Sequence, residues 1–361
     1  MKILNKNLND IFYFITPPII YRFISKICAK KRLVNEPQLD SLKSSLDSLR
    51  KERFEYFFKD SVIDDFCDAM TDNFYTHTPH KAKNTENQKY LDQIENSGFV
   101  VLPRLINSID IKKWMATLEP VLDRHSVLLN KHRKNYAESD GIGLTSKSVT
   151  YNEEELRVIH NIFDGVIRIW NPAILVPEIA SKVEQNETIN DICQAYLSNK
   201  TSISTSYIDV KCVPDALDSS VVIHCDSPFK ILKVFIPLED VEIKNAPFLY
   251  FTGSHKPFAF KLLKSFLEFT QFNKKWFDFH SFYGHIGLFK AAEQFPQFNI
   301  KPEIVTVKAG DVIIADTSGM HAATNLIDGR RVQLGLVYSM RGYDIGDIPE
   351  AIKIKSKDSS Y

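Results

Sequence analysis

The sequence predicts an α+β protein built around a double-stranded β-helix, a jelly-roll barrel of the cupin type, with flanking helices and an N-terminal helical extension. Short segments rich in β-branched and aromatic residues follow one another between residues 202 and 338, and turns separate them. Helical patterns lie before residue 200, and we expect those helices to pack against one side of the barrel.

The composition sets bounds on the class of protein. Of the 361 residues, 44% are hydrophobic and 12% aromatic, which is ample for a packed core in one large domain or two. The formal net charge is zero, and no nucleic-acid-binding pattern is present, so we expect no nucleic-acid partner. The five cysteines are scattered and show no CxxC spacing, and no cleavable signal peptide is evident. Both observations favour a reducing, cytoplasmic location.

Residues 1–85 are predicted to form the helical extension, and residues 86–361 the main domain. Within residues 8–32, the stretch from 11 to 28 is aromatic and apolar, but two prolines and two basic residues interrupt it, so it falls short of a membrane-spanning helix. Its basic flanks favour peripheral contact with a membrane surface. The alternative is a helix packed on the main domain or on a partner. The oligomeric state is left open.

The first elements of the main domain are expected to be mostly helical. Gly98 ends a helix as a C-terminal cap, and Pro120 is expected to kink or split another. In chain order we predict a helix at Tyr90–Asn96, a strand at Phe99–Leu102, a helix at Ile111–Leu128, a mobile loop at 131–150, and helical segments at Glu153–Phe163 and Val176–Leu197.

The strands of the barrel follow. We expect strands at Ser202–Cys212, Val221–Ser227, Lys230–Pro237, Phe248–Phe251, Val312–Ala315 and Arg331–Tyr338. A Phe-rich insertion at residues 258–301 separates two of them. The insertion is predicted to be either a lid over an apolar substrate or a helical cover with a core of its own.

Residues 221–227 carry the strongest chemical signal in the chain. Three β-branched residues lead into His224, so His224 and Asp226 should lie two apart on one face of a strand. The pair alone is weak evidence, because 10 histidines and 45 acidic residues predict roughly one such pair by chance. The alternative is a hydrogen-bonded pair with no ligand.

A second histidine, His321, follows the Val312–Ala315 strand and completes the pattern. With His224 and Asp226 it would form the two-His-one-carboxylate face of non-haem Fe(II) oxygenases, whose open positions accept a 2-oxo acid and O₂. The next strand begins with two arginines, and a guanidinium is a planar two-pronged partner for the far carboxylate of 2-oxoglutarate.

These residues in this order resemble the phytanoyl-CoA dioxygenase family of Fe(II)/2-oxoglutarate oxygenases over residues 86 to 345, approximately. The resemblance rests on the ordered set His224-x-Asp226, Gly253-Ser254-His255, Gly310-Asp311, His321 and Arg331, with a helix–Gly–strand opening at Tyr90–Pro103. It implies iron on the two histidines and Asp226. It also implies that Arg331, rather than Arg330, anchors 2-oxoglutarate.

The resemblance further implies the reaction class. The related halogenases lack the carboxylate, so the intact Asp226 favours hydroxylation of an unactivated C–H bond, with release of succinate and CO₂. A non-catalytic jelly-roll binding module is one alternative, and desaturation or ring closure at the same iron is another. The substrate is expected to be a small or amphiphilic molecule, and the Phe-rich insertion with the basic, apolar N-terminus favours a lipid-linked one. Tyr207, Asp209 and Lys211 share one strand face, and any of them could contact 2-oxoglutarate.

Overall fold

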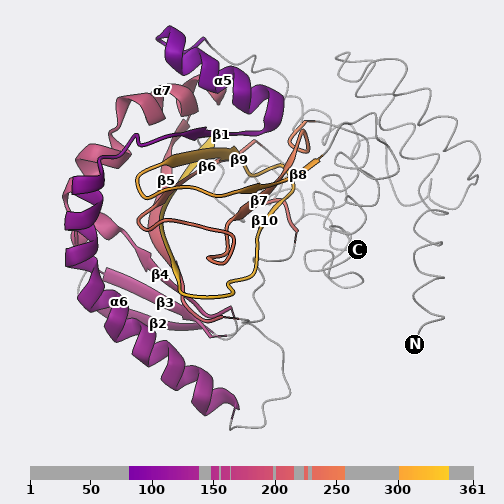
Figure 1. Cartoon of the computed structure of the whole chain (residues 1–361). Helices are drawn as coiled ribbons and strands as arrows, with labels where there is room; N and C mark the ends of the chain where they lie inside the picture. Colours follow the sequence, from indigo (N-terminus) through magenta and orange to yellow (C-terminus); the bar gives the residue numbers. More distant parts are fainter. Residues whose placement is uncertain are drawn as a thin grey trace, which may run out of the picture. The chain divides into compact units, whose positions relative to one another are not determined.

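The computed structural model describes residues 81–137, 148–153, 156–162, 164–197, 201–214, 223–226, 230–256 and 301–340. These residues form two antiparallel sheets, with helices along one face of the larger sheet (Figure 1). The predicted N-terminal extension up to residue 80 and residues 258–300 of the predicted insertion lie outside the described residues. Within the described ranges, no helix is both long enough and apolar enough to cross a membrane.

The larger sheet has eight strands in the order β1-β9-β6-β11-β5-β4-β3-β2. Its strands are β1 (Phe99–Leu102), β2 (Ser148–Glu153), β3 (Leu156–Asn161), β4 (Val166–Trp170), β5 (Thr201–Lys211), β6 (Leu232–Pro237), β9 (Val312–Asp316) and β11 (Arg331–Met340). Strand β11 is central and pairs with β5 on one side and β6 on the other.

The smaller sheet has the order β10-β7-β8, formed by β10 (His321–Ala323), β7 (Phe248–Thr252) and β8 (Lys301–Val305). His224 extends it by an isolated antiparallel bridge to His321. From β5 onward the chain therefore passes back and forth between the two sheets. Phe235, Ile313 and Phe99 of the larger sheet pack against Tyr250 and Val305 of the smaller one.

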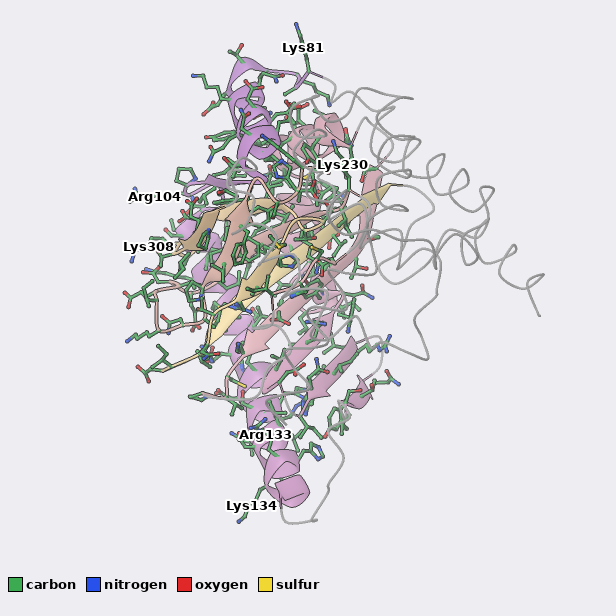
Figure 2. The ribbon with its side chains drawn as sticks, turned by 90° about the vertical axis from the view of Figure 1, so that its right-hand side faces the viewer. Lys81, Arg104, Arg133, Lys134, Lys230 and Lys308 are labelled. Carbon is green, nitrogen blue, oxygen red and sulfur yellow. The ribbon has the colours of Figure 1, made fainter. Side chains whose placement is uncertain are left out.

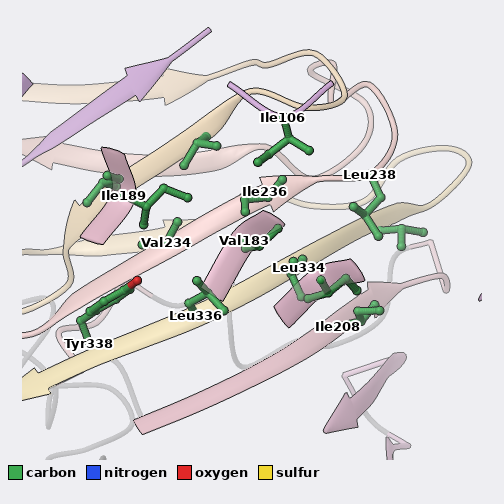
Figure 3. Close-up of a cluster of buried hydrophobic side chains, with 14 of the residues drawn as sticks. Ile106, Val183, Ile189, Ile208, Val234, Ile236, Leu238, Leu334, Leu336 and Tyr338 are labelled. Atoms are coloured by element: carbon green, nitrogen blue, oxygen red, sulfur yellow. The ribbon is translucent and has the colours of Figure 1, made fainter. Parts of the chain in front are cut away.

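The opposite, outer face of the larger sheet packs on the helices. These are α5 (Thr85–Ser97), α6 (Ser108–Ala137), a 3₁₀ turn (Pro172–Ile174), a π-helical turn (Ala180–Glu184) and α7 (Glu187–Tyr196). Figure 3 shows alternate residues of three neighbouring strands, among them Ile208, Val234 and Leu334, pointing toward Val183 and Ile189. Because alternate strand residues share a face, the residues between them project toward the smaller sheet.

Several sequence predictions are confirmed. Helix α5 ends at Gly98, which caps it with φ +92°, and β1 has the expected bounds. The later barrel strands also lie where predicted, although only residues 223–226 of the Val221–Ser227 segment are described. Helix α6 is a single helix that runs through Pro120 and continues to Ala137, so residues 131–137 of the predicted loop are helical. Residues 148–150 belong to β2, and the residues between lie outside the described ranges.

The helical prediction for Glu153–Phe163 is wrong. Residues 156–161 form β3, whose side chains alternate between buried and partly exposed, with Leu156, Val158 and His160 facing the helices. The hydrophobic residues of this segment recur with a period of two, which is the period of a strand. Val176–Leu197 is helical in two pieces, because the side chain of Asn186 caps α7 by accepting a hydrogen bond from the Ile189 amide. Strands β2, β4, β8 and β10 were not predicted.

A histidine pair lies between α6 and the outer face of β3. Both rings are buried, and His125 Nδ1 lies 2.8 Å from His160 Nε2. Arg124, which only donates, contacts His125 Nε2 at 3.4 Å, so His125 Nδ1 is the donor to His160. Burial, with a contribution from His125 and then His132, lowers the pKa of His160 to about 4. His160 is therefore neutral in the folded protein.

We expect folding stability to fall as the pH drops from about 6.5, the ordinary histidine pKa, to about 4. In that window the unfolded chain takes up a proton at His160 that the folded chain does not, so protonation favours unfolding. Thermal melting at about pH 7 and about pH 5 should show a larger loss in the natural chain than in a His160→Phe variant. An equal loss in both would contradict this origin.

Candidate metal centre

His224, Asp226 and His321 meet at one end of the space between the two sheets. His224 and His321 exchange two backbone hydrogen bonds of 2.9 Å, and the Asp226 amide donates to the Thr317 carbonyl at 2.9 Å. The three side chains each offer a ligand atom, and these atoms all lie within 4.8 Å of one another. Among the described residues, this is the group of three that could hold a metal ion.

The ligand atoms are near the spacing that a metal requires. His224 Nε2 lies 3.7 Å from Asp226 Oδ1, and His321 Nε2 lies 3.5 Å from Asp226 Oδ2. Octahedral neighbours bound at about 2.1 Å are separated by roughly 3 Å, so a small contraction would close the site. Two imidazoles and one carboxylate are a donor set suited to Fe(II) with one face open.

The ring of His321 is fixed by its neighbours. Its Nδ1–H donates to the Gly319 carbonyl at 3.0 Å, which leaves the Nε2 lone pair directed to Asp226. The adjacent Met320 amide donates to Ser254 Oγ at 2.7 Å. Ser254 belongs to the Gly-Ser-His turn, whose His255 Nε2 bonds the Glu95 carbonyl at 3.0 Å. The turn therefore supports His321 and is tied to α5.

The charges around Asp226 keep the ligands ready for a cation. Burial lowers the pKa of His321 to about 3 despite the opposing attraction of Asp226, so the imidazole is neutral. Burial alone would raise the pKa of Asp226, but Lys233 and the two histidines hold it well below its usual range. Lys233 Nζ lies 2.7 Å from Asp226 Oδ2.

Arg331 and Arg330 lie on opposite faces of the larger sheet. Arg331 is buried, donates to the Ala246 carbonyl at 2.5 Å and reaches Asp209 at 3.4 Å. Its Nε atom is buried without a hydrogen-bond partner in the described part of the chain. Arg330 instead pairs with Glu119 and Glu239.

Arg331 borders the same inter-sheet space as the histidines. It contacts Ala246, two residues before Phe248, whose ring centroid lies 5.7 Å from that of His321. The three candidates on β5 also lie on this inner face, because Asp209 and Lys211 are both buried and Lys211 is paired in register with Arg331. Asp209 contacts Arg168 and Arg331. It is therefore a partner of Arg331 and not a residue that binds the carboxylate of 2-oxoglutarate.

Sequence reasoning missed Lys233 and Ser254. Lys233 stands alone as a charged residue in the apolar strand β6, and that exception to the hydrophobic run was the available signal. Ser254 was seen only as part of a turn, because its bond to Met320 joins residues 66 positions apart. Contacts of that range are set by the pairing of strands and have no local sequence signature.

Gly319→Ala is expected to weaken metal binding and destabilise the fold. A Cβ at Gly319 would overlap the Tyr250 hydroxyl and approach Ser254 Oγ to 2.9 Å, so the turn that holds His321 must shift. Such overpacking costs about 1–3 kcal/mol. Gly329→Ala is the matched control, because its strained φ of +72° lies in the turn before β11 and not in the turn that holds His321. Melting and Fe(II) titration of both variants should show reduced affinity only for Gly319→Ala, and equal affinities would contradict the role of the turn.

No family model and no curated protein sequence matches the chain. Among solved structures, it is similar to the non-haem α-ketoglutarate-dependent carbocyclase SnoK from nogalamycin biosynthesis, with 19% identity, a TM-score of 0.44, and coverage of 73% of this chain and 87% of SnoK. It is also similar to the epimerase SnoN in complex with Fe³⁺, α-ketoglutarate and nogalamycin RO, with 13% identity, a TM-score of 0.43, and coverage of 71% and 84%.

A third similar structure is HygX from Streptomyces hygroscopicus with nickel and 2-oxoglutarate bound. It is 13% identical, with a TM-score of 0.43, and the match covers 72% of this chain and 89% of HygX. These identities and TM-scores do not identify the reaction of the present chain, which depends on its own side chains.

Proposed function

We propose that the protein is an Fe(II)- and 2-oxoglutarate-dependent dioxygenase that hydroxylates an unactivated C–H bond of a small or amphiphilic molecule. The observation that supports this most is the convergence of two imidazoles and one carboxylate, from segments about 100 residues apart, at one end of the inter-sheet space. Iron held by these three side chains would supply, together with 2-oxoglutarate and O₂, an oxidant for C–H bonds, with succinate and CO₂ as the products of 2-oxoglutarate.

The residues of the chain have distinct roles in this proposal. His224 and His321 would bind the metal through Nε2, and Asp226 through a carboxylate oxygen, while Gly319 fixes the His321 tautomer. Phe235, Phe248 and Tyr250 pack beside the ligands and limit the access of water.

Arg331 would orient 2-oxoglutarate through its distal carboxylate. The buried Nε without a partner and the long 3.4 Å contact with Asp209 leave the guanidinium able to accept a second anion. Asp209 keeps the guanidinium in place, since it is itself held by Arg168 at 2.9 Å.

The proposal includes a fold, the double-stranded β-helix, and a relation to a known family. A chain that passes between two antiparallel sheets, with β9-β6-β11-β5 in one and His224, β10, β7 and β8 in the other, supports a double-stranded β-helix. It also supports a relation to the phytanoyl-CoA dioxygenase family. The N-terminal extension 1–85, with segment 8–32 at a membrane surface or packed on the protein, and the insertion 258–301, as a lid or a helical cover, stay predictions that fall mainly outside the described residues.

The proposal is tested by anaerobic equilibrium dialysis with Fe(II) and 2-oxoglutarate, followed by exposure to O₂ and measurement of succinate. We expect one iron and one 2-oxoglutarate per chain, and slow succinate formation even without the substrate. Binding of both without any succinate would favour the non-catalytic binding module. Absence of iron binding would contradict the proposal.

A further inference from the structure

The inner face of the larger sheet carries two cations close to the candidate metal centre. Residues paired across antiparallel strands share a face, so Arg168 lies with its partner Asp209, and Lys233 lies with its partner Val337. The side chain of Lys233 is 15% exposed and that of Arg168 is 36% exposed, so both are accessible in the described part of the chain.

Two aromatic rings lie on the same face as these cations. Trp170, Tyr207 and Gly335 are paired in register across β4, β5 and β11. A Cβ at Gly335 would come within 2.6 Å of the Tyr207 ring, so the ring lies across β11 in the space that the glycine leaves. The Arg168 guanidinium is 5.1 Å from the centroid of the Tyr207 ring, and Trp170 packs at 5.7 Å on the same ring.

The cations on this face exceed the carboxylates available to them. Four cations lie on this face: Lys233, Arg168, Arg331 and the buried Lys211. The carboxylates beside them are Asp226 and Asp209, and Asp164 adds a weaker attraction to Arg168 from the β3–β4 turn. Asp226 is also the candidate metal ligand. Fe(II) would add two positive charges and 2-oxoglutarate two negative ones, so loading the site leaves Lys233 next to a metal-bound carboxylate without further compensation.

We propose that Lys233 and Arg168 bind an anionic group of the organic substrate, a carboxylate or a phosphate, above Tyr207. Trp170 and Tyr207 then contact the apolar part of the substrate next to that group. Because Lys233 touches a metal ligand, the anionic group lies only a few bonds from the oxidised carbon. This inference names the substrate class of the proposed function and rests on that function.

The test uses n-butyl phosphate, butyrate and neutral n-butanol as probes. The protein is loaded with 2-oxoglutarate and Mn(II), a paramagnetic substitute for Fe(II), and ³¹P and ¹³C relaxation of the probes is measured. We expect saturable enhancement for one or both anions and none for butanol, and comparison of the two anions distinguishes phosphate from carboxylate. If butanol gives the same relaxation enhancement as the anions, the inference is overturned.

Charge-removing variants show whether the two cations carry the effect. Lys233→Met and Arg168→Gln should each weaken anion binding about tenfold, the effect of losing one charge-assisted hydrogen bond, whereas Lys233→Arg retains it. The control is Lys308→Gln, at the 64% exposed lysine that Figure 2 places at the periphery. Unchanged anion binding in the first two variants would overturn the inference.

Two further measurements separate this inference from the proposed function. If Lys233→Met lowers 2-oxoglutarate affinity as much as it lowers anion affinity, Lys233 serves the co-substrate and the inference fails. Line broadening of the probes with metal-free protein tests the cation pair even when Mn(II) does not bind. Loss of Mn(II) and 2-oxoglutarate binding with retained anion binding would therefore contradict the function alone.

Discussion

Asp226→Ala is expected to lower Fe(II) affinity by more than about 100-fold and to abolish 2-oxoglutarate-dependent succinate formation. Substitution of a residue that only holds a metal ligand in place lowers metal affinity by about 10–100-fold, so loss of the ligand itself should lower it further. The control is Asp240→Ala, which removes an exposed carboxylate paired with Lys308. Fe(II) titration by calorimetry checks the result, and retained turnover would remove Asp226 from the ligand set.

The same substitution has a second, separable effect. It leaves Lys233 without its carboxylate, and a cation that is only 15% exposed is destabilising when it loses its partner. The double variant Asp226→Ala/Lys233→Met removes both charges and should recover most of the lost melting temperature while still failing to bind Fe(II). Recovery of metal binding in the double variant would show that unfolding, rather than ligand loss, explained the single one.

Arg331→Gln is expected to raise the dissociation constant for 2-oxoglutarate by roughly 30- to 150-fold, which corresponds to about 2–3 kcal/mol for lost hydrogen bonds to a charged group. Iron affinity should be unchanged, because Arg331 does not contact His224, Asp226 or His321. Asp209 stays paired with Arg168, so the fold is expected to persist.

The adjacent Arg330 provides a matched control. Arg330→Gln removes ion pairs with Glu119 and Glu239 on the outer face, which should cost at most about 1 kcal/mol of stability each. Its 2-oxoglutarate affinity should equal that of the natural chain. Equal losses of 2-oxoglutarate affinity in the two variants, measured by anaerobic calorimetry in the presence of iron, would contradict the assignment of Arg331.

The parts of the site that follow local rules were predictable from the sequence. The two-residue period of a strand places His224 and Asp226 on one strand face, and the Gly310-Asp311 turn directly precedes β9. The order of His321 and Arg331 after that strand then suggested one site. The helical prediction was wrong for β3, although its hydrophobic residues recur with the two-residue period of a strand.

The rest of the site depends on pairing between distant strands. Lys233 reaches Asp226, and Tyr207 occupies the space left by Gly335, 128 positions later, only once β5, β11 and β6 are in register. A single sequence states which residues are polar but not which strand lies beside which. The charge balance of the inner face is therefore visible only in the folded chain.

The most direct test is a crystal structure of the protein loaded anaerobically with Fe(II), with anomalous diffraction recorded at the iron edge. We expect a single anomalous peak bonded to Nε2 of His224, Nε2 of His321 and a carboxylate oxygen of Asp226. A peak at the His125–His160 pair, or no peak among these three side chains at full iron occupancy, would contradict the account.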